Sequence, residues 1–197
     1  MLVSVGKATP PPDQKDASMP LLIETERLIL RAWRDNDVEP YNAMYNDPIV
    51  GEYFPNSQTL EDSADFIAFC RAHDSTHGYC FQPMVEKDTG AFVGDIGLAV
   101  IEFDGPIKGQ TEIGWMMNRE FWGRGYATEM AQALIQRGFS DFGLTEILAF
   151  TVLANHKSRA VMERLGMERD EAGDFDHPNV LEGHPLRPHI LYRKRRA

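Results

Sequence analysis

The sequence predicts one α/β domain built on a mixed, mostly antiparallel sheet with helices packed against it. The first supporting observation is the length of 197 residues, which suits a single domain whose core is large enough to need no disulfide or structural metal. The second is a series of short strand-like segments in the first half of the chain. The third is an alternation of helical and strand-like segments in the second half.

The first half of the chain contains one predicted strand, two predicted helices and then a run of strands. Residues 27–33 show the period of two that is typical of a half-buried strand. One helix is predicted from about Val38 until Pro48 stops it, and another follows from Thr59, where Asp62 completes a capping box. Three further strands are predicted over residues 79–86, 92–103 and 110–118.

The second half of the chain alternates helix and strand. Apolar side chains keep a period near 3.6 over residues 126–142, which predicts a helix closed by Gly143. A strand over residues 146–153 and a helix capped by Asn155 follow. A terminal strand is predicted over residues 190–192.

Composition and charge exclude several classes of protein. Residues 1–20 lack the apolar segment of a secretory signal, and we expect a flexible leader there, before a domain over residues 21–197. The only cysteines, Cys70 and Cys80, form no Cys-x-x-Cys pair, which argues against a zinc ribbon or disulfide framework and favours the cytoplasm. The net charge of −10 disfavours nucleic acid and anionic membranes as partners, and no apolar run is long enough to span a membrane.

A glycine-bearing turn before the long helix carries the strongest chemical signal. Gly123, Arg124 and Gly125 precede a helix that begins at about Tyr126. Glycines let the backbone approach a ligand closely, and the free N–H groups at the start of a helix favour an anion. The sequence therefore predicts a phosphate or pyrophosphate site at this turn.

Two common nucleotide-binding motifs do not fit this turn. A Walker loop requires Gly-Lys-Ser/Thr at its end, and no lysine is near. A dinucleotide-binding fingerprint requires a third glycine, and this chain has Thr128 at that position. The fingerprint also requires an acidic residue at the end of the following strand, whereas Glu146 stands at the beginning of that strand. Both nucleoside triphosphate chemistry and a dinucleotide-binding fold are therefore disfavoured.

The segment Trp122-Gly-Arg-Gly-Tyr-Ala127 resembles the acetyl-coenzyme A (acetyl-CoA) pyrophosphate loop of the GNAT superfamily of N-acetyltransferases, Gln/Arg-x-x-Gly-x-Gly/Ala. Trp122 replaces the usual Gln or Arg, as in the branch that resembles the acetyltransferases of ribosomal-protein N-termini. Two further motifs match in order, Thr25-Glu-Arg-Leu-Ile-Leu-Arg31 and Asn155-x-x-Ser158 followed by Leu165-Gly166-Met167. The resemblance spans residues 21–170.

This resemblance implies a sheet with helices on both faces, splayed where its fourth and fifth strands diverge, and acetyl-CoA as co-substrate in the resulting slot. Backbone groups of Met116 and Met117 would pair with the pantetheine arm. Asn155 and Ser158 would lie near the thioester and the pantetheine. The remaining coenzyme-binding residues would be Trp122, Gly123, Arg124, Gly125, Tyr126, Ala127 and Thr128, which surround the pyrophosphate.

The resemblance also implies direct transfer of the acetyl group to a neutral primary amine, on a protein N-terminus, a polyamine or another small amine. Glu112 matches the catalytic glutamate of several branches, which acts as a base through water; the other interpretation is an exposed carboxylate at a strand end. Many members use a tyrosine as the acid where this chain has Met162. Ser158 is the candidate to replace it, and capping of its helix is the alternative role.

The tail over residues 174–189 is rich in proline and histidine. The spacings between His177, His184 and His189 fit no zinc pattern, so we expect no metal. The tail is expected either to form a wall over the acceptor pocket, with His177 or His189 sensing or deprotonating the amine, or to be a structural connection. Trp33 is a further candidate for the acceptor mouth, with burial in the core as the alternative.

Three functions stay open on this basis. An N-acetyltransferase in the cytoplasm is the first, with an amine substrate as its partner. A non-catalytic acyl-CoA-binding sensor or partner module is the second, favoured by the absent tyrosine. A nucleotide-dependent enzyme is the third. Many relatives are dimers, so a homodimer is compatible with the sequence.

Overall fold

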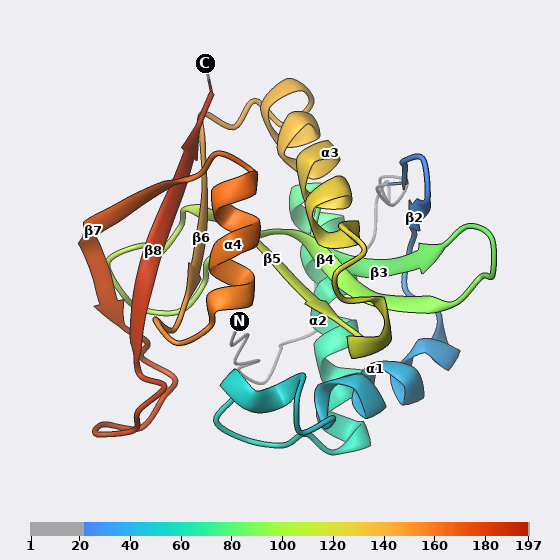
Figure 1. Cartoon of the computed structure of the whole chain (residues 1–197), viewed down its shortest axis with the longest axis horizontal. Coiled ribbons are helices and arrows are strands. Elements are labelled where there is room, and N and C mark those ends of the chain that lie inside the picture. Colours follow the sequence, from blue (N-terminus) through green and yellow to red (C-terminus); the bar gives the residue numbers. More distant parts are fainter. Residues whose placement is uncertain (1–21, 197) are drawn as a thin grey trace.

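The computed structural model describes residues 22–196, which form one eight-stranded sheet and four α-helices (Figure 1). The strand order is β1-β2-β3-β4-β5-β6-β8-β7. All neighbouring strands are antiparallel except β5 and β6, which are parallel. The predicted mixed, mostly antiparallel α/β sheet is confirmed. The leader expected over residues 1–20 lies outside the described residues.

Each predicted helix and strand is present, and two strands are added to them. The strands are β1 (Ile23–Glu24), β2 (Leu28–Leu30), β3 (Phe81–Glu86), β4 (Phe92–Val100), β5 (Thr111–Met117), β6 (Glu146–Thr151), β7 (Glu168–Asp176) and β8 (Pro188–Arg195). The α-helices are α1 (Val38–Tyr45), α2 (Leu60–His77), α3 (Tyr126–Ser140) and α4 (His156–Arg164). None of these helices is both long enough and apolar enough to cross a membrane.

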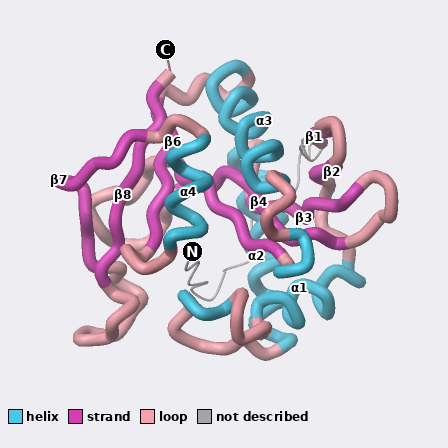
Figure 2. The backbone as a smooth tube through the Cα atoms, viewed as in Figure 1, coloured by secondary structure: helices cyan, strands magenta, loops and turns pink. Residues whose placement is uncertain are grey.

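Helices cover both faces of the sheet, as expected (Figure 2). On one face, Met130 and Leu134 of α3 and Met162 of α4 are buried against the central strands. On the other face, Tyr41 of α1 and Phe66 of α2 are buried against the same strands. Full burial of one such side chain contributes about 1.5–3 kcal/mol, so both layers hold the central strands in place.

The start of α2 has the local geometry that the sequence predicts. The Thr59 hydroxyl accepts a hydrogen bond from the Asp62 backbone N–H at 3.1 Å, and the Asp62 carboxylate accepts one from the Thr59 N–H at 2.8 Å. These reciprocal bonds satisfy N–H groups that the helix itself cannot. The helix then ends at Gly78, whose φ of 80° is left-handed.

Strand β7 is the main difference from the predicted fold. It occupies residues 168–176, at the edge of the sheet, and its charged side chains are mostly exposed, so it has no apolar alternation to detect. Asp170 of β7 instead accepts a hydrogen bond from Arg193 Nε of β8 at 2.5 Å. Part of the tail expected to be a loop is therefore a hairpin strand, held largely by polar pairs.

Candidate active site

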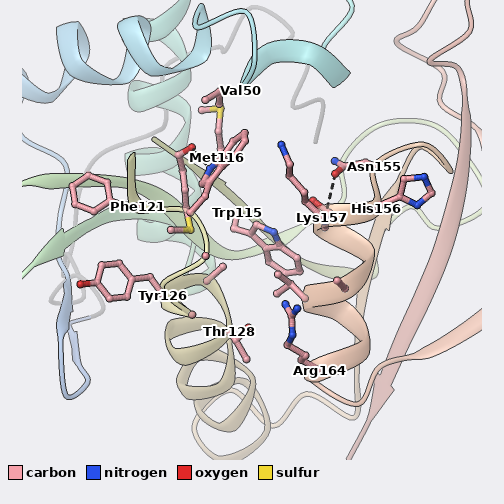
Figure 3. Close-up of a pocket in the computed structure, with 18 of the residues that line it drawn as sticks. Val50, Trp115, Met116, Phe121, Tyr126, Thr128, Asn155, His156, Lys157 and Arg164 are labelled. Atoms are coloured by element: carbon pink, nitrogen blue, oxygen red, sulfur yellow. Dashed lines mark hydrogen bonds between the residues drawn. The ribbon is translucent and has the colours of Figure 1, made fainter. Parts of the chain in front are cut away.

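A cleft opens where β5 and β6 separate, between the N-terminus of α3 and helix α4 (Figure 3). The two strands pair at one position only, Glu112 opposite Leu148, and the register does not continue along either strand. The expected splay is therefore present, with β5 and β6 as the diverging pair. The cleft has a volume of about 1060 Å³, comparable to the largest pockets that hold small ligands and cofactors.

The glycine turn forms one end of this cleft. Gly123 and Gly125 have φ values of 75° and 80°, which explains the choice of glycine at both positions. Gly125 is also the N-cap of α3, and no side chain caps this helix. The N–H groups of its first turn are therefore free to bind an anion, and Ala127 and Thr128 of that turn line the cleft.

The Arg124 side chain leaves the cleft. Its Nη1 lies 3.3 Å from Glu86 Oε1, which also accepts a hydrogen bond from the Tyr126 hydroxyl at 2.6 Å. Arg27 donates to the Arg124 carbonyl at 2.9 Å and pairs with Glu129 of α3. The motif around Arg27, which is distant in sequence, thus supports the glycine turn. Arg124, which was expected to bind the coenzyme, is not among the described residues that line the cleft.

Trp122 joins the end of β5 to α4. Its indole Nε1 donates to the Met117 carbonyl at 2.9 Å, and Lys157 Nζ of α4 lies 3.9 Å from the centre of its ring. The Met116 and Met117 side chains line the cleft beside it. Trp122 therefore fixes the backbone at the point where the resemblance places the pantetheine arm.

Asn155 and Ser158 meet at the start of α4 and both line the cleft. Asn155 Oδ1 accepts a hydrogen bond from the Ser158 N–H at 3.1 Å, drawn as a dashed line in Figure 3. Asn155 thus caps the helix, so the Ser158 hydroxyl is not required as the cap. That hydroxyl has no hydrogen-bond partner among the described residues, so it is free to meet a ligand.

Two basic side chains of α4 line the cleft and were not singled out in the sequence. Lys157 and Arg164 are seven residues apart, about two helical turns, and so lie on one face of the helix. That spacing was a signal available in the sequence. Tyr53, whose hydroxyl donates to the Ala154 carbonyl at 3.2 Å, links the segment between α1 and α2 to the loop before α4.

Glu112 is buried on the face of β5 that carries α1 and α2. It lies opposite Ala99 of β4, is 6% exposed, and is absent from the described residues that line the cleft. Burial raises the pKa of its carboxyl to about 8. The alternative interpretation, an exposed strand-end carboxylate, is wrong because the helical layer covers this part of β5.

A second buried carboxyl, Asp95 of β4, lies on the same face and was missed by the sequence interpretation. It stands opposite Met116 in the ladder between β4 and β5. Burial raises its pKa to about 8 as well. No local motif marks Asp95, because its environment is created by α1 and α2 packing over the strand.

Three residues proposed for the acceptor site lie elsewhere. His177 and His189 are buried in an aromatic cluster beside Phe103, with the two imidazole centres 5.1 Å apart, and neither lines the cleft. Burial lowers the pKa of His189 to about 4, so it is uncharged near neutral pH. Trp33 is in the core, where its indole N–H donates to the Phe81 carbonyl at 2.8 Å. These three expectations are corrected.

One group of side chains among the described residues has metal-like spacing. Ligand atoms of His73, His77 and Glu102 lie within 4.8 Å of one another. However, His73 Nδ1 is 3.0 Å from the Tyr79 carbonyl and Nε2 accepts the Val100 N–H at 3.1 Å. Both ring nitrogens already have partners, so the arrangement does not offer a complete ligand set.

Comparison with known proteins places this chain in a family. The family model for the acetyltransferase (GNAT) domain matches residues 27–168. The chain belongs to the GNAT acetyltransferases. A relative described as the uncharacterized N-acetyltransferase YnaD of Bacillus subtilis (strain 168) is 30% identical over 148 residues, which are 75% of this chain and 83% of the relative.

Solved structures agree with this GNAT assignment. The acetyltransferase from Agrobacterium tumefaciens str. C58 is 26% identical with a TM-score of 0.72, over 94% of this chain and 100% of the other. A putative ribosomal-protein-serine acetyltransferase from Vibrio cholerae shares the fold, with a TM-score of 0.73 at 19% identity over 91% and 100% of the chains. The assignment as an acetyl-CoA-dependent N-acetyltransferase is thus confirmed.

Proposed function

We propose that this GNAT enzyme acetylates a primary amine by direct transfer from acetyl-CoA, with a small amine, a polyamine or a protein N-terminus as the acceptor. The single observation that carries the proposal is that an uncapped helix N-terminus and the separated edge of β5 face one cleft. The first suits a diphosphate and the second suits the amide-bearing pantetheine arm.

The residues of the cleft fit acetyl-CoA as a substrate. Backbone N–H groups from Gly125 to Thr128 would hold the pyrophosphate. Lys157 and Arg164, which line the same cleft, would pair with phosphate oxygens. With about 1060 Å³ between them and β5, the cleft can admit an extended coenzyme.

The chemical step requires the amine lone pair to attack the thioester carbonyl carbon. The C–S bond then breaks, coenzyme A leaves as a thiolate and the amine loses a proton. We assign the Met117 N–H to the developing oxyanion, which could contribute about 3 kcal/mol. Glu112 would accept the amine proton through water, and the Ser158 hydroxyl would donate a hydrogen bond to the thiolate.

Burial of the thiols supports direct transfer. Cys70 and Cys80 are both almost fully buried, and neither is among the described residues that line the cleft. An acyl-enzyme on either sulfur would require the core to open. Met162, in place of the family tyrosine, is 2% exposed and packs in the core, so it takes no part in the reaction.

Steady-state kinetics on a panel of primary amines test the proposal. Thiol release from acetyl-CoA should depend on the amine, mass spectrometry should find the acetylated amine, and initial-rate lines should intersect, as a ternary complex requires. Parallel lines, or acetyl label trapped on a cysteine, would contradict direct transfer. Coenzyme binding without modification of any amine would contradict catalysis of amine acetylation.

A further inference from the structure

A small chamber adjoins the cleft on the α1 and α2 side of the sheet. Its lining residues are five aromatic residues, one amide, one carboxyl and one thioether: Tyr41, Tyr45, Phe54, Phe66, Trp115, Gln58, Asp95 and Met116. Phe54, Trp115 and Met116 also line the cleft, so the two spaces share a wall. The chamber has a volume of about 20 Å³, and a cavity needs roughly 10–15 Å³ to hold one water molecule. It therefore accommodates one group of the size of water.

Asp95 is the only acidic side chain among the described residues that line this chamber. It is 2% exposed, and its Oδ1 is buried with no hydrogen-bond partner in the described part of the chain. Among the described residues, the other hydrogen bond of the Asp95 carboxyl is to its own backbone N–H, whereas buried carboxyls ordinarily have partners for both oxygens. A ligand that supplies N–H donors and positive charge would complete this site.

The aromatic walls suit a cation. Tyr41 stacks on Phe66 with ring centres 4.9 Å apart, and Tyr45 stacks on Phe54 at 4.6 Å. Stacking fixes these side chains, and aromatic rings attract ammonium groups through their quadrupoles. The chamber thus combines five aromatic residues with the Asp95 carboxyl and the Gln58 amide around a space suited to a single small polar group.

The position of the chamber connects it to the reaction. Asp95 lies directly opposite Met116 in the antiparallel ladder, and side chains of opposed residues project to the same face of a sheet. Met116 belongs to the strand end beside which the thioester carbonyl is proposed to lie. An amine held by Asp95 would therefore approach the reacting carbonyl from the α1 and α2 side. The bound ammonium first gives up one proton to water, which frees the lone pair that attacks.

We propose that this chamber binds the primary ammonium group of an unbranched acceptor amine, with Asp95 as its counter-ion. The inference rests on the proposed function and specifies its acceptor. A primary ammonium offers three N–H donors and is close to a water molecule in size. A branch at the adjacent carbon, as at a protein N-terminus, needs more room than the chamber provides.

The test uses the full chain saturated with coenzyme A, whose binding is first measured by calorimetry. n-Propylammonium chloride is then titrated at constant ionic strength, with the melting temperature as readout. The titration is performed at pH 8.5, because burial raises the pKa of Asp95 to about 8. We expect a saturable rise in melting temperature, and no rise with 1-propanol, which has the same length but no charge.

Two variants separate a binding role from a general effect of charge. Asp95→Asn keeps the shape of the side chain and should weaken n-propylammonium binding at least tenfold, with coenzyme A affinity unchanged. Asp88→Asn, an exposed aspartate in the turn between β3 and β4, should bind like the wild type. Equal binding by Asp95→Asn and the wild type, or an equal response to 1-propanol, would overturn the proposal.

Isopropylammonium tests the choice between unbranched amines and α-branched N-termini. It carries the same charge, and we expect it to bind at least tenfold more weakly than n-propylammonium. Equal or tighter binding would overturn the assignment to an unbranched amine. Failure of coenzyme A to bind would instead contradict the proposed function, so the two failures are distinguishable.

Stability of the variant gives an independent readout. Because Asp95 Oδ1 has no hydrogen-bond partner to lose and the other hydrogen bond of the carboxyl is to its own backbone, Asp95→Asn should melt no lower than the wild type without ligand. A lower melting temperature would indicate a structural role and contradict the proposal. If Asp95→Asn does not fold, Phe54→Leu is the second variant, because Phe54 is a half-buried residue of the chamber wall. Phe54→Leu should weaken n-propylammonium binding severalfold. Unchanged n-propylammonium binding by Phe54→Leu would overturn the proposed cation site.

Discussion

Two buried carboxyls are central to the proposed chemistry of this protein. Glu112 and Asp95 lie on the same face of the sheet, opposite Ala99 and Met116 respectively, and burial raises the pKa of each to about 8. A carboxyl with such a pKa can accept a proton near neutral pH. Their surroundings differ, because Asp95 lines the small chamber whereas Glu112 is enclosed near Cys80 and His73.

Replacement of Glu112 by Gln tests its proposed role as base. Wild-type kcat should rise with pH toward about 8 as the carboxyl ionises, and Glu112→Gln should remove that rise. We expect a loss of at least tenfold at pH 8.5 and a smaller loss at pH 6.5, measured by thiol release. Glu102→Gln, at an exposed position, is the control. An unchanged pH profile in Glu112→Gln would remove Glu112 from the mechanism.

At the level of elements, the parts of the site that are local in sequence could be predicted and the rest could not. The glycine turn and the Thr59 capping box depend on neighbouring residues, so their geometry follows from spacing alone. Strand β7 depends on pairing with β8 and has no apolar period. His177 and His189 were misplaced for the same reason, since only the folded hairpin shows that they face an aromatic cluster and not the cleft.

The N-cap of α4 and a residue of its first turn separate stability from activity. Asn155→Ala removes the cap and should lower the free energy of unfolding by about 1 kcal/mol. Ser158→Ala leaves the cap in place and should preserve stability, but it should lower kcat about tenfold by removing the donor to the thiolate. Urea unfolding and thiol release measure the two effects. Full activity in Ser158→Ala would contradict its role.

At the scale of the whole molecule, the fold brings three free polar groups in and beside one cleft while the two helical layers hold the sheet. The uncapped start of α3, the Ser158 hydroxyl and the Asp95 carboxyl all lie at or beside the separation of β5 from β6. A buried unpaired carboxyl destabilises a fold. Stability should therefore depend on pH through the same group that is proposed to bind the acceptor.

The stability of the wild type relative to Asp95→Asn should fall as pH rises from about 5 to about 8. In this range the unfolded chain has lost the Asp95 proton, whereas the folded chain still holds it, because the folded pKa is raised to about 8. The difference in unfolding free energy should change by up to about 1.4 kcal/mol per pH unit. Urea titrations at several pH values measure it. A difference that does not vary with pH would contradict a raised pKa for Asp95.

The central claim is that free N–H groups at the start of α3 bind the diphosphate of the coenzyme. Calorimetric titration with coenzyme A tests it most directly, with two glycine variants as a matched pair. Gly125→Ala and Gly90→Ala replace glycines with φ values of 80° and 71°, so each should cost about 1 kcal/mol of stability or more. Only Gly125 lies at the cleft.

We expect one coenzyme A bound per wild-type chain, a similar affinity in Gly90→Ala, and an affinity at least tenfold weaker in Gly125→Ala. Absence of heat with the wild type, or equal affinity in both variants, would contradict the account.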